Sequence, residues 1–241
     1  MKTKRLVLVL NGKGGVGKSF FAVNFVQYLE DKDIPHWAAD TDNENSTLTR
    51  FHSDIAFIDL QETTEIDRIL LALDHHELVL VDCRAASTDV FLDYFTEIEI
   101  FSVLAELDTE LTIVSPINHE ADSLEQLRVI TDSLGNRCQY LIVRNKSHSS
   151  QFRLYDDSKI RKKLLKELQA TELGLPKMQD WLVTALNEAN LTASVASRET
   201  HLSLLDRQRL KVWVKQFEEQ LAPALPKLLS LSETSNTEKK A

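Results

Sequence analysis

The chain alternates short apolar runs with longer segments in which apolar residues recur every three or four positions. The runs have the β-branched and aliphatic composition of buried strands, and the periodic segments have the pattern of amphipathic helices. We expect strands at residues 4–10, 34–39, 56–60, 78–82, 111–114, 139–143 and 173–175. We expect helices at residues 19–30, 87–101 (capped by Ser87), 120–134, 157–170, 179–187 and 202–221.

Strands that alternate with helices are typical of βαβ units. The predicted fold class is therefore α/β, a three-layer sandwich with a mainly parallel sheet and helices on both faces. No linker or repeat interrupts residues 1–221, which we expect to form a single domain. Residues 222–241 are polar and contain helix-breaking prolines, so we expect a disordered tail without a membrane anchor.

Charge is distributed unevenly along the 241 residues. The formal net charge of −9 argues against a protein that coats nucleic acid with its whole surface. Residues 40–110 hold 18 acidic and only 3 basic side chains, whereas basic residues gather in two predicted helices, at 159–166 and 207–215. These two basic helices either present solvated faces or contact DNA or an acidic partner.

No apolar run is long enough to span a membrane, and the first residues lack the pattern of a cleavable leader. The two cysteines are far apart in the sequence and form no CxxC motif. We therefore expect a cytoplasmic protein without a disulfide framework or a cysteine-rich metal site.

Residues 12–19, between the first strand and the first helix, fit the phosphate-loop pattern G-x-x-x-x-G-K-[ST]. Glycines let the backbone turn its N–H groups toward phosphate oxygens, and the following helix adds its positive end. Lys18 would reach the β- and γ-phosphates of ATP, and Ser19 would ligate Mg²⁺. The residues expected at the nucleotide are Gly12, Gly14, Gly15, Val16, Gly17, Lys18, Ser19 and Phe20.

Acidic residues end two of the predicted strands. Asp40 and Asp42 follow the second strand, and Asp82 ends the apolar run 78–82 in the manner of a Walker B strand. Ligands of a parallel sheet lie outside the carboxyl ends of its strands, so these acids should lie near the phosphate loop. Asp82 would hold the Mg²⁺ shell through water. Alternatively, Asp40 and Asp42 serve only to cap a turn and take no part in binding.

The sequence from Lys13 to Ser19 resembles the deviant Walker A motif of the ParA/MinD-type ATPases. The resemblance implies an ATP-dependent homodimer in which two protomers enclose two ATP molecules and Lys13 acts on the partner's nucleotide. It also implies that Asp42 positions the attacking water and that Asp40 supports Mg²⁺ through water. Lys13, Lys18 and Asp42 would then be the catalytic residues.

The resemblance continues further along the chain. It implies that Asn145 binds the adenine ring and that Pro176 flanks it. The chain departs from the family at Phe20, where a threonine is common, and at residues 83–87, which replace a Thr-Pro-Pro-like switch. Arg84 within that segment could sense the nucleotide or form a structural ion pair.

Three phrases, at residues 40–48, 81–89 and 118–123, are similar to the ParA-like proteins of conjugative plasmids, the TraL and StbB type. This similarity implies a role in plasmid transfer, partition or stability in the bacterial cytoplasm, with a protein partner in such a complex. Two other functions stay open. One is a nucleotide-gated adaptor with negligible hydrolysis, and the other is a small-molecule kinase or ligase on the same fold.

Overall fold

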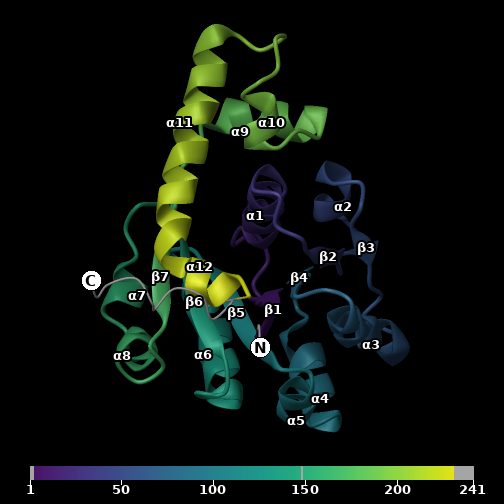
Figure 1. Cartoon of the computed structure of the whole chain (residues 1–241). Coiled ribbons are helices and arrows are strands. Elements are labelled where there is room, and N and C mark those ends of the chain that lie inside the picture. The colour runs from purple at the N-terminus through teal and green to yellow at the C-terminus, as the bar shows by residue number, and fades with distance from the viewer. Residues whose placement is uncertain (1–2, 148, 231–241) are drawn as a thin grey trace, which may run out of the picture.

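The computed structural model describes residues 3–147 and 149–230. Its described part contains a seven-stranded sheet in the order β3-β2-β4-β1-β5-β6-β7 (Figure 1). Every neighbouring pair of these strands is parallel, which confirms the predicted fold class. The strands are β1 (Lys4–Val9), β2 (Trp37–Asp40), β3 (Ala56–Phe57), β4 (Leu78–Asp82), β5 (Thr109–Ile117), β6 (Gln139–Asn145) and β7 (Thr171–Leu175).

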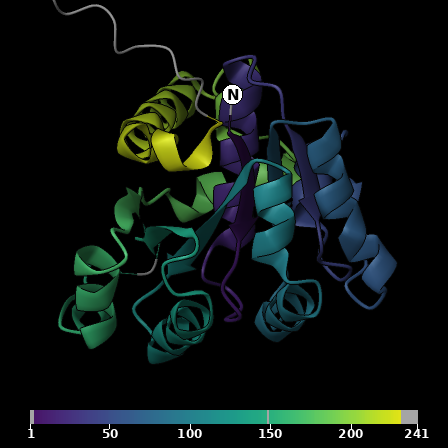
Figure 2. The ribbon, with the colours of Figure 1, turned by 60° about the horizontal axis from the view of Figure 1, so that its bottom comes forward.

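Helices cover both faces of the sheet (Figure 2). Alternate residues of a strand point to opposite faces, so Leu6 and Leu8 join one apolar cluster and Val7 and Val9 the other. One layer contains α1 (Lys18–Asp31), α2 (Thr47–Phe51), α9 (Asp180–Ala189), α10 (Ala193–Ala196), α11 (Leu204–Leu221), η2 (Ala222–Ala224) and α12 (Leu225–Leu228). The other layer contains α3 (Thr63–Leu71), η1 (Ala72–Asp74), α4 (Thr88–Glu97), α5 (Ile100–Glu106), α6 (Ala121–Leu134), α7 (Arg153–Asp156) and α8 (Lys159–Lys166).

The carboxyl ends of the central strands lie level with one another. Val9 of β1 pairs with Asp82 of β4, and Asp82 pairs in turn with Asp40 of β2. The chain leaves β1 toward β2 and later crosses to β5 on the other side, so the strand order reverses around β1. Such a reversal opens a crevice at the carboxyl edge, where ligands of α/β sheets bind.

Strand β5 is longer than the sequence pattern predicts, because Ser115 and Pro116 continue it. Proline normally interrupts a central strand, since it cannot donate a ladder hydrogen bond. Here the pairing with β1 ends at Val114, and beyond it β5 pairs with β6 alone. The side chain of Asn11 donates to the carbonyl of Pro116 (3.0 Å) and takes over part of the missing partner's role.

The segment 87–101, expected as one helix, forms the separate helices α4 and α5. The break falls at Glu99, which adopts a left-handed φ of 48°. Ser87 stands at the N-cap of α4, but its hydroxyl donates to the carbonyl of Arg84 (2.8 Å) instead of accepting a helix N–H. The expectation of a single helix capped by the Ser87 side chain was therefore wrong.

The tail expected from residue 222 onward does not begin there. Residues 222–230 continue as η2 and α12, and Leu228 is completely buried. The buried guanidinium of Arg5 donates to the carbonyl of Pro226 (3.1 Å) and fastens this segment to β1. Prolines end the long helix α11 here, but the apolar residues between them still have a core to pack on. Residues 231–241 lie outside the described residues.

Candidate nucleotide-binding site

The phosphate loop curls between the end of β1 and the start of α1. Gly17, the N-cap of α1, has a φ of 99°, which disfavours any residue with a Cβ. A Cβ at Gly17 would also lie 2.4 Å from Nδ2 of Asn145. That amide donates to the carbonyl of Val16 (2.9 Å), so strand β6 holds the loop from behind.

A cavity of about 380 Å³ opens at this edge of the sheet. Its size lies within the range of roughly 300–1,000 Å³ that is usual for ligand pockets. The loops after β1, β2 and β4 supply its walls together with the start of α1 and with α2. The lining residues are Gly14, Gly15, Gly17, Lys18, Ser19, Phe20, Asp42, Asn45, Thr47, Arg50, Cys83, Arg84 and Ala85.

Lys18 lies in the first turn of α1, and only 7% of its surface is exposed. Its Nζ donates to the carbonyl of Lys13 (3.1 Å), which aligns the ammonium group with the loop. Burial lowers the pKa of Lys18, while the nearby carboxylate of Asp82 opposes that effect. A desolvated cation at a helix N-terminus is well placed to attract phosphate oxygens.

Asp82 is a buried acid. Neither of its carboxylate oxygens has a hydrogen-bond partner among the described residues. Burial raises its pKa to about 7, and the neighbouring Asp40 adds to the rise. The Ser19 hydroxyl and Lys18 oppose the rise, although the hydroxyl does not complete a hydrogen bond. A buried, unpartnered carboxylate is costly unless a cation or a proton neutralises it.

These oxygen donors fit a magnesium ion. Mg²⁺ prefers oxygen ligands and commonly combines one or two protein groups with substrate phosphates and water. The carboxylate of Asp82 and the hydroxyl of Ser19 are such groups. Within the described ranges, no cluster of three or more His, Cys, Asp or Glu side chains could hold a metal. A cation here would therefore take its remaining ligands from phosphates and water.

The two acids after β2 differ in their surroundings. Asp40 is fully buried, and its two oxygens accept the backbone N–H groups of Asp42 and Leu48 (2.9 Å each). Burial raises the pKa of Asp40, and these hydrogen bonds oppose the rise. Asp40 thus shapes the loop that leads into α2. Asp42 lines the cavity, and one of its oxygens accepts the N–H groups of Glu44 (3.0 Å) and Asn45 (3.1 Å).

Lys13 extends away from its own cavity, which it does not line. Its Nζ lies 3.1 Å from Asp122 Oδ2 and 3.4 Å from Glu120 Oε2, at the start of α6. These two carboxylates raise the pKa of Lys13 and keep it positively charged. The ammonium group therefore lies on the surface beside the cavity.

The loop after β4 is tied to the loop after β2. The Thr41 hydroxyl accepts the N–H of Arg84 (2.8 Å) and donates to the carbonyl of Asp82 (3.2 Å). Arg84 lines the cavity, and Arg50 joins it from α2. Sequence reasoning did not assign Asn45, Thr47 or Arg50 to the site, because the phosphate-loop motif fixes no position in the loop and short helix after β2.

Of the residues expected at the nucleotide, Phe20 lines the cavity, whereas Asn145 and Pro176, which were expected at the base, do not. Phe20 packs its ring on Trp213 of α11, with 5.5 Å between centroids. The carbonyl of Pro176 accepts the indole N–H of Trp213 (2.9 Å), and Asn145 engages Val16 and Ser147.

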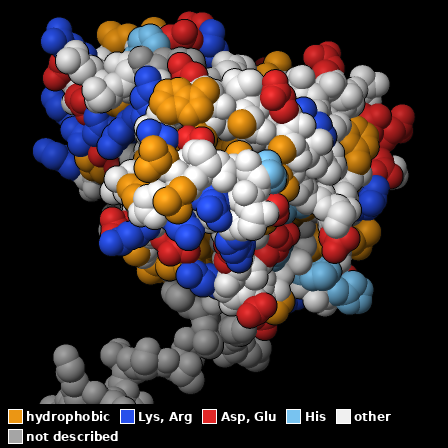
Figure 3. Space-filling model, turned by 90° about the horizontal axis from the view of Figure 1, so that it is seen from above, with side chains coloured by type: hydrophobic (Ala, Val, Ile, Leu, Met, Phe, Trp, Pro, Cys, Tyr) orange, Lys and Arg blue, Asp and Glu red, His pale blue; other side chains and the backbone are white. Residues whose placement is uncertain are grey.

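The two basic helices do not form one surface. Helix α8 contributes to the apolar cluster on one face of the sheet, and α11 to the cluster on the other. In α8, Glu172 holds Arg161 and Asp132 holds Lys163 in ion pairs. Figure 3, seen from above, shows Lys and Arg side chains gathered mainly on the left of the view. The basic residues at 159–166 and 207–215, expected as solvated faces or contacts for DNA or an acidic partner, therefore lie in different layers and do not share one face.

Comparison with known proteins identifies the family of the chain. The family model of the CobQ/CobB/MinD/ParA nucleotide binding domain matches residues 7–231. The chain belongs to this nucleotide-binding family. Its members include the ParA/MinD-type proteins that the phosphate loop resembles. Protein MobD of Acidithiobacillus ferrooxidans is 27% identical over 216 residues, which span 87% of this chain and 93% of MobD.

Solved structures show the same fold at low sequence identity. The septum site-determining protein MinD of Pyrococcus horikoshii OT3, complexed with Mg-ADP, has a TM-score of 0.54 at 15% identity and covers 92% of this chain and 98% of its own. The Cyanothece McdA(D38A)–ATP complex has a TM-score of 0.51 at 10% identity and covers 96% and 100%. No helix in the described part of this chain is long and apolar enough to cross a membrane.

Proposed function

We propose that this chain is a Mg²⁺-dependent ATPase that switches between a monomer and an ATP-bound homodimer. The observation that carries the proposal is the buried Asp82 carboxylate, unpartnered among the described residues and facing Ser19 beside a glycine-rich loop. A Mg²⁺ ion accompanied by phosphates would satisfy this carboxylate. The family membership supports a nucleotide as the ligand.

The residues around the cavity have three distinct roles: phosphate binding, Mg²⁺ binding and positioning of water. The loop N–H groups and Lys18 bind the phosphates, and Ser19 and Asp82 hold Mg²⁺, which neutralises charge that develops on the phosphoryl group. Asp42 lies in the cavity wall and would orient the attacking water. Catalysis of this kind depends on positioning and electrostatics, so we expect slow turnover until every group is in place.

Dimerisation would complete the site. Lys13 lies on the surface beside its own cavity, where it pairs with the exposed acids Glu120 and Asp122 at the N-terminal end of α6. A second copy placed across this face would receive that ammonium group near its own phosphates. The added charge would stabilise the transition state, as an arginine finger does.

We further propose a bacterial, cytoplasmic role in plasmid transfer, partition or stability. The similarity of three sequence phrases to the ParA-like proteins of conjugative plasmids supports this context. Any direct DNA contact would use a single basic helix, α8 or α11, because the two lie on opposite faces of the sheet.

Magnesium-dependent ATP binding and phosphate release test the core of the proposal. We expect ATP affinity and turnover in the full-length protein to rise with Mg²⁺, and Ser19→Ala to remove most of that dependence. Ser150→Ala, which removes an exposed hydroxyl from a loop, is the matched control. Tight Mg·ATP binding without phosphate release would favour the nucleotide-gated adaptor. An ATP affinity that changes neither with Mg²⁺ nor in Ser19→Ala would overturn the assignment of the site.

A further inference from the structure

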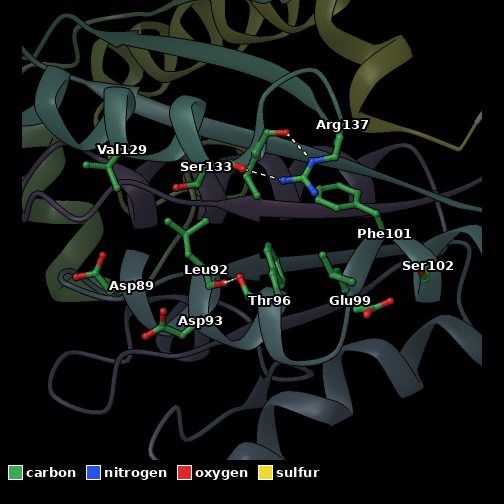
Figure 4. A pocket seen from close by; sticks show the side chains of 13 residues that line it. Asp89, Leu92, Asp93, Thr96, Glu99, Phe101, Ser102, Val129, Ser133 and Arg137 are labelled. Carbon is green, nitrogen blue, oxygen red and sulfur yellow. Dashed lines mark hydrogen bonds between the residues drawn. The ribbon is translucent and has the colours of Figure 1, made fainter.

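A second cavity, of about 900 Å³, lies between helices α4 and α5 on one side and α6 on the other (Figure 4). Side chains of α4 stand along one wall, and Val129 and Ser133 of α6, with Arg137 from the loop after α6, stand along the opposite wall. A smaller hollow of about 320 Å³ adjoins it, because Phe101 and Arg137 line both. Together they form a groove, which we call the α4–α6 groove.

The α4–α6 groove has an apolar floor and an acidic rim. Apolar side chains such as Leu92, Phe95 and Val129 line it. The exposed acids Asp89, Asp93 and Glu99 stand along the α4–α5 side. In the described part of the chain, no ion pair within 4.0 Å joins these three acids to a basic residue.

The basic residue of the groove is already engaged. The guanidinium of Arg137 lies 4.4 Å from the centroid of the Phe101 ring. It also donates to the backbone carbonyls of Ser133 (2.8 Å) and Leu134 (3.2 Å). Arg137 therefore lies at one end of the groove and, among the described residues, forms no ion pair with the three rim carboxylates. The three acids outnumber this one cation along the groove. An acidic rim over an apolar floor repels phosphate groups and favours a cationic ligand with apolar side chains.

Both walls of the groove begin at the phosphate loop. Just before α4, the N–H of Ala86 donates to the carbonyl of Gly12 (2.9 Å). On α6, the side-chain oxygen of Gln126 is so close that a Cβ on Gly12 would lie 2.2 Å from it. Lys13 pairs with Asp122 in the first turn of α6. A ligand that spreads or clamps α4 against α6 would therefore act on Gly12 and Lys13.

We propose that the α4–α6 groove is a docking site for a basic amphipathic helix of a partner protein. The ten residues of α4 extend over about 15 Å, which matches about three turns of a docked helix. Its apolar side chains would enter the groove, and its Lys or Arg side chains would meet Asp89, Asp93 and Glu99. Docking would also change the rate of ATP turnover, an effect that rests on the proposed function, whereas the binding itself does not.

A synthetic peptide tests the binding. The probe is a fluorescein-labelled 15-residue amphipathic helix of Leu, Lys and Arg, titrated with the full-length protein and followed by fluorescence anisotropy. A peptide of the same composition in scrambled order controls for charge alone. We expect the amphipathic peptide to bind at least tenfold more tightly than the scrambled one at physiological ionic strength.

Matched protein variants locate the binding. The double variant Asp89→Asn/Asp93→Asn removes two charges from the groove, and Asp54→Asn/Glu62→Gln removes two exposed charges from the same acidic block elsewhere. We expect at least a tenfold loss of affinity for the first and less than a twofold loss for the second. Val129→Trp, which fills the groove without changing charge, should also weaken binding tenfold, with its fold checked by circular dichroism.

Equal losses for the two double variants would overturn the docking site, because binding would then be general attraction to an acidic protein. Equal binding of the scrambled peptide would do the same. The peptide should alter phosphate release in the wild type but not in Asp89→Asn/Asp93→Asn. If the protein releases no phosphate under any condition, the proposed ATPase fails, and the anisotropy measurements still decide the docking site.

Discussion

Replacing Asp82 with asparagine should stabilise the protein when neither metal nor nucleotide is present. The substitution removes a buried charge that has no hydrogen-bond partner in the described structure, and it preserves the size and shape of the side chain. Burial raises the pKa of Asp82 from 3.8 to about 7. At 1.36 kcal/mol per pKa unit, ionised Asp82 costs at most about 4 kcal/mol of folding free energy.

The pH dependence has a definite sign. Between about pH 4 and pH 7 the folded protein binds the Asp82 proton more tightly than the unfolded chain does. The free energy of unfolding contributed by this group therefore falls as pH rises through that window, and the full cost is present above pH 7. The variant lacks this slope. Its advantage over the wild type should grow by about 3 kcal/mol between pH 5 and pH 8.

Urea unfolding in EDTA at several pH values measures this difference. Asp54→Asn, which removes an exposed carboxyl group, should stay within about 0.5 kcal/mol of the wild type throughout. With Mg·ATP the variant's advantage at pH 8 should shrink, because only the wild type gains the binding energy. That gain is about 2.7 kcal/mol at one hundred times the dissociation constant, and about 4.1 kcal/mol at one thousand times, which cancels the advantage. A variant that is less stable than the wild type at pH 8 in EDTA, or a difference that ignores pH, would refute the reasoning.

Three further substitutions test the phosphate loop, its support by β6, and the packing of α12 separately. Lys18→Ala should abolish detectable ATP binding by calorimetry, since it removes the buried cation at the phosphates; retained micromolar affinity would contradict the role of Lys18. Asn145→Ala should cost about 1–3 kcal/mol in chemical unfolding and weaken ATP binding, because the carbonyl of Val16 loses its partner; unchanged stability and affinity would show that the loop needs no such support. Leu228→Ala should destabilise the fold by about 2–5 kcal/mol, whereas Leu204→Ala, at a site that is 72% exposed, should have little effect; equal effects would mean that α12 adds nothing to the core.

The central sheet could be predicted from the sequence because its strands are continuous apolar runs. The run 78–82 coincides with β4. The runs 4–10 and 139–143 match β1 and β6 to within two residues at their ends. Helices α2, α7, α10 and α12 were not predicted, since each has only four or five residues and is fixed by packing rather than by a long apolar period. The sequence analysis also missed α3, which has nine residues. The extension of β5 through Pro116 was not predicted either, because whether a proline fits a strand depends on which neighbouring strand it faces at that level.

The candidate site was predictable where a motif fixes the backbone. The phosphate loop and the acids at the strand ends lie together because parallel strands end at one edge of the sheet. The pattern could not show that Asp40 is occupied by backbone N–H groups while Asp82 has no partner in the described structure. It also could not place Asn145 against the loop, because that contact joins residues 129 positions apart.

The solution mass tests the central claim most directly. Light scattering should be recorded on full-length Asp42→Ala without nucleotide, with ADP·Mg²⁺ and with ATP·Mg²⁺, and again with ATP·Mg²⁺ after Lys13→Gln is added. We expect Asp42→Ala to remain monomeric in the first two conditions and to double its mass with ATP·Mg²⁺, and we expect Lys13→Gln to prevent the doubling. A mass that ignores the nucleotide, or a dimer that Lys13→Gln leaves intact, would contradict the account.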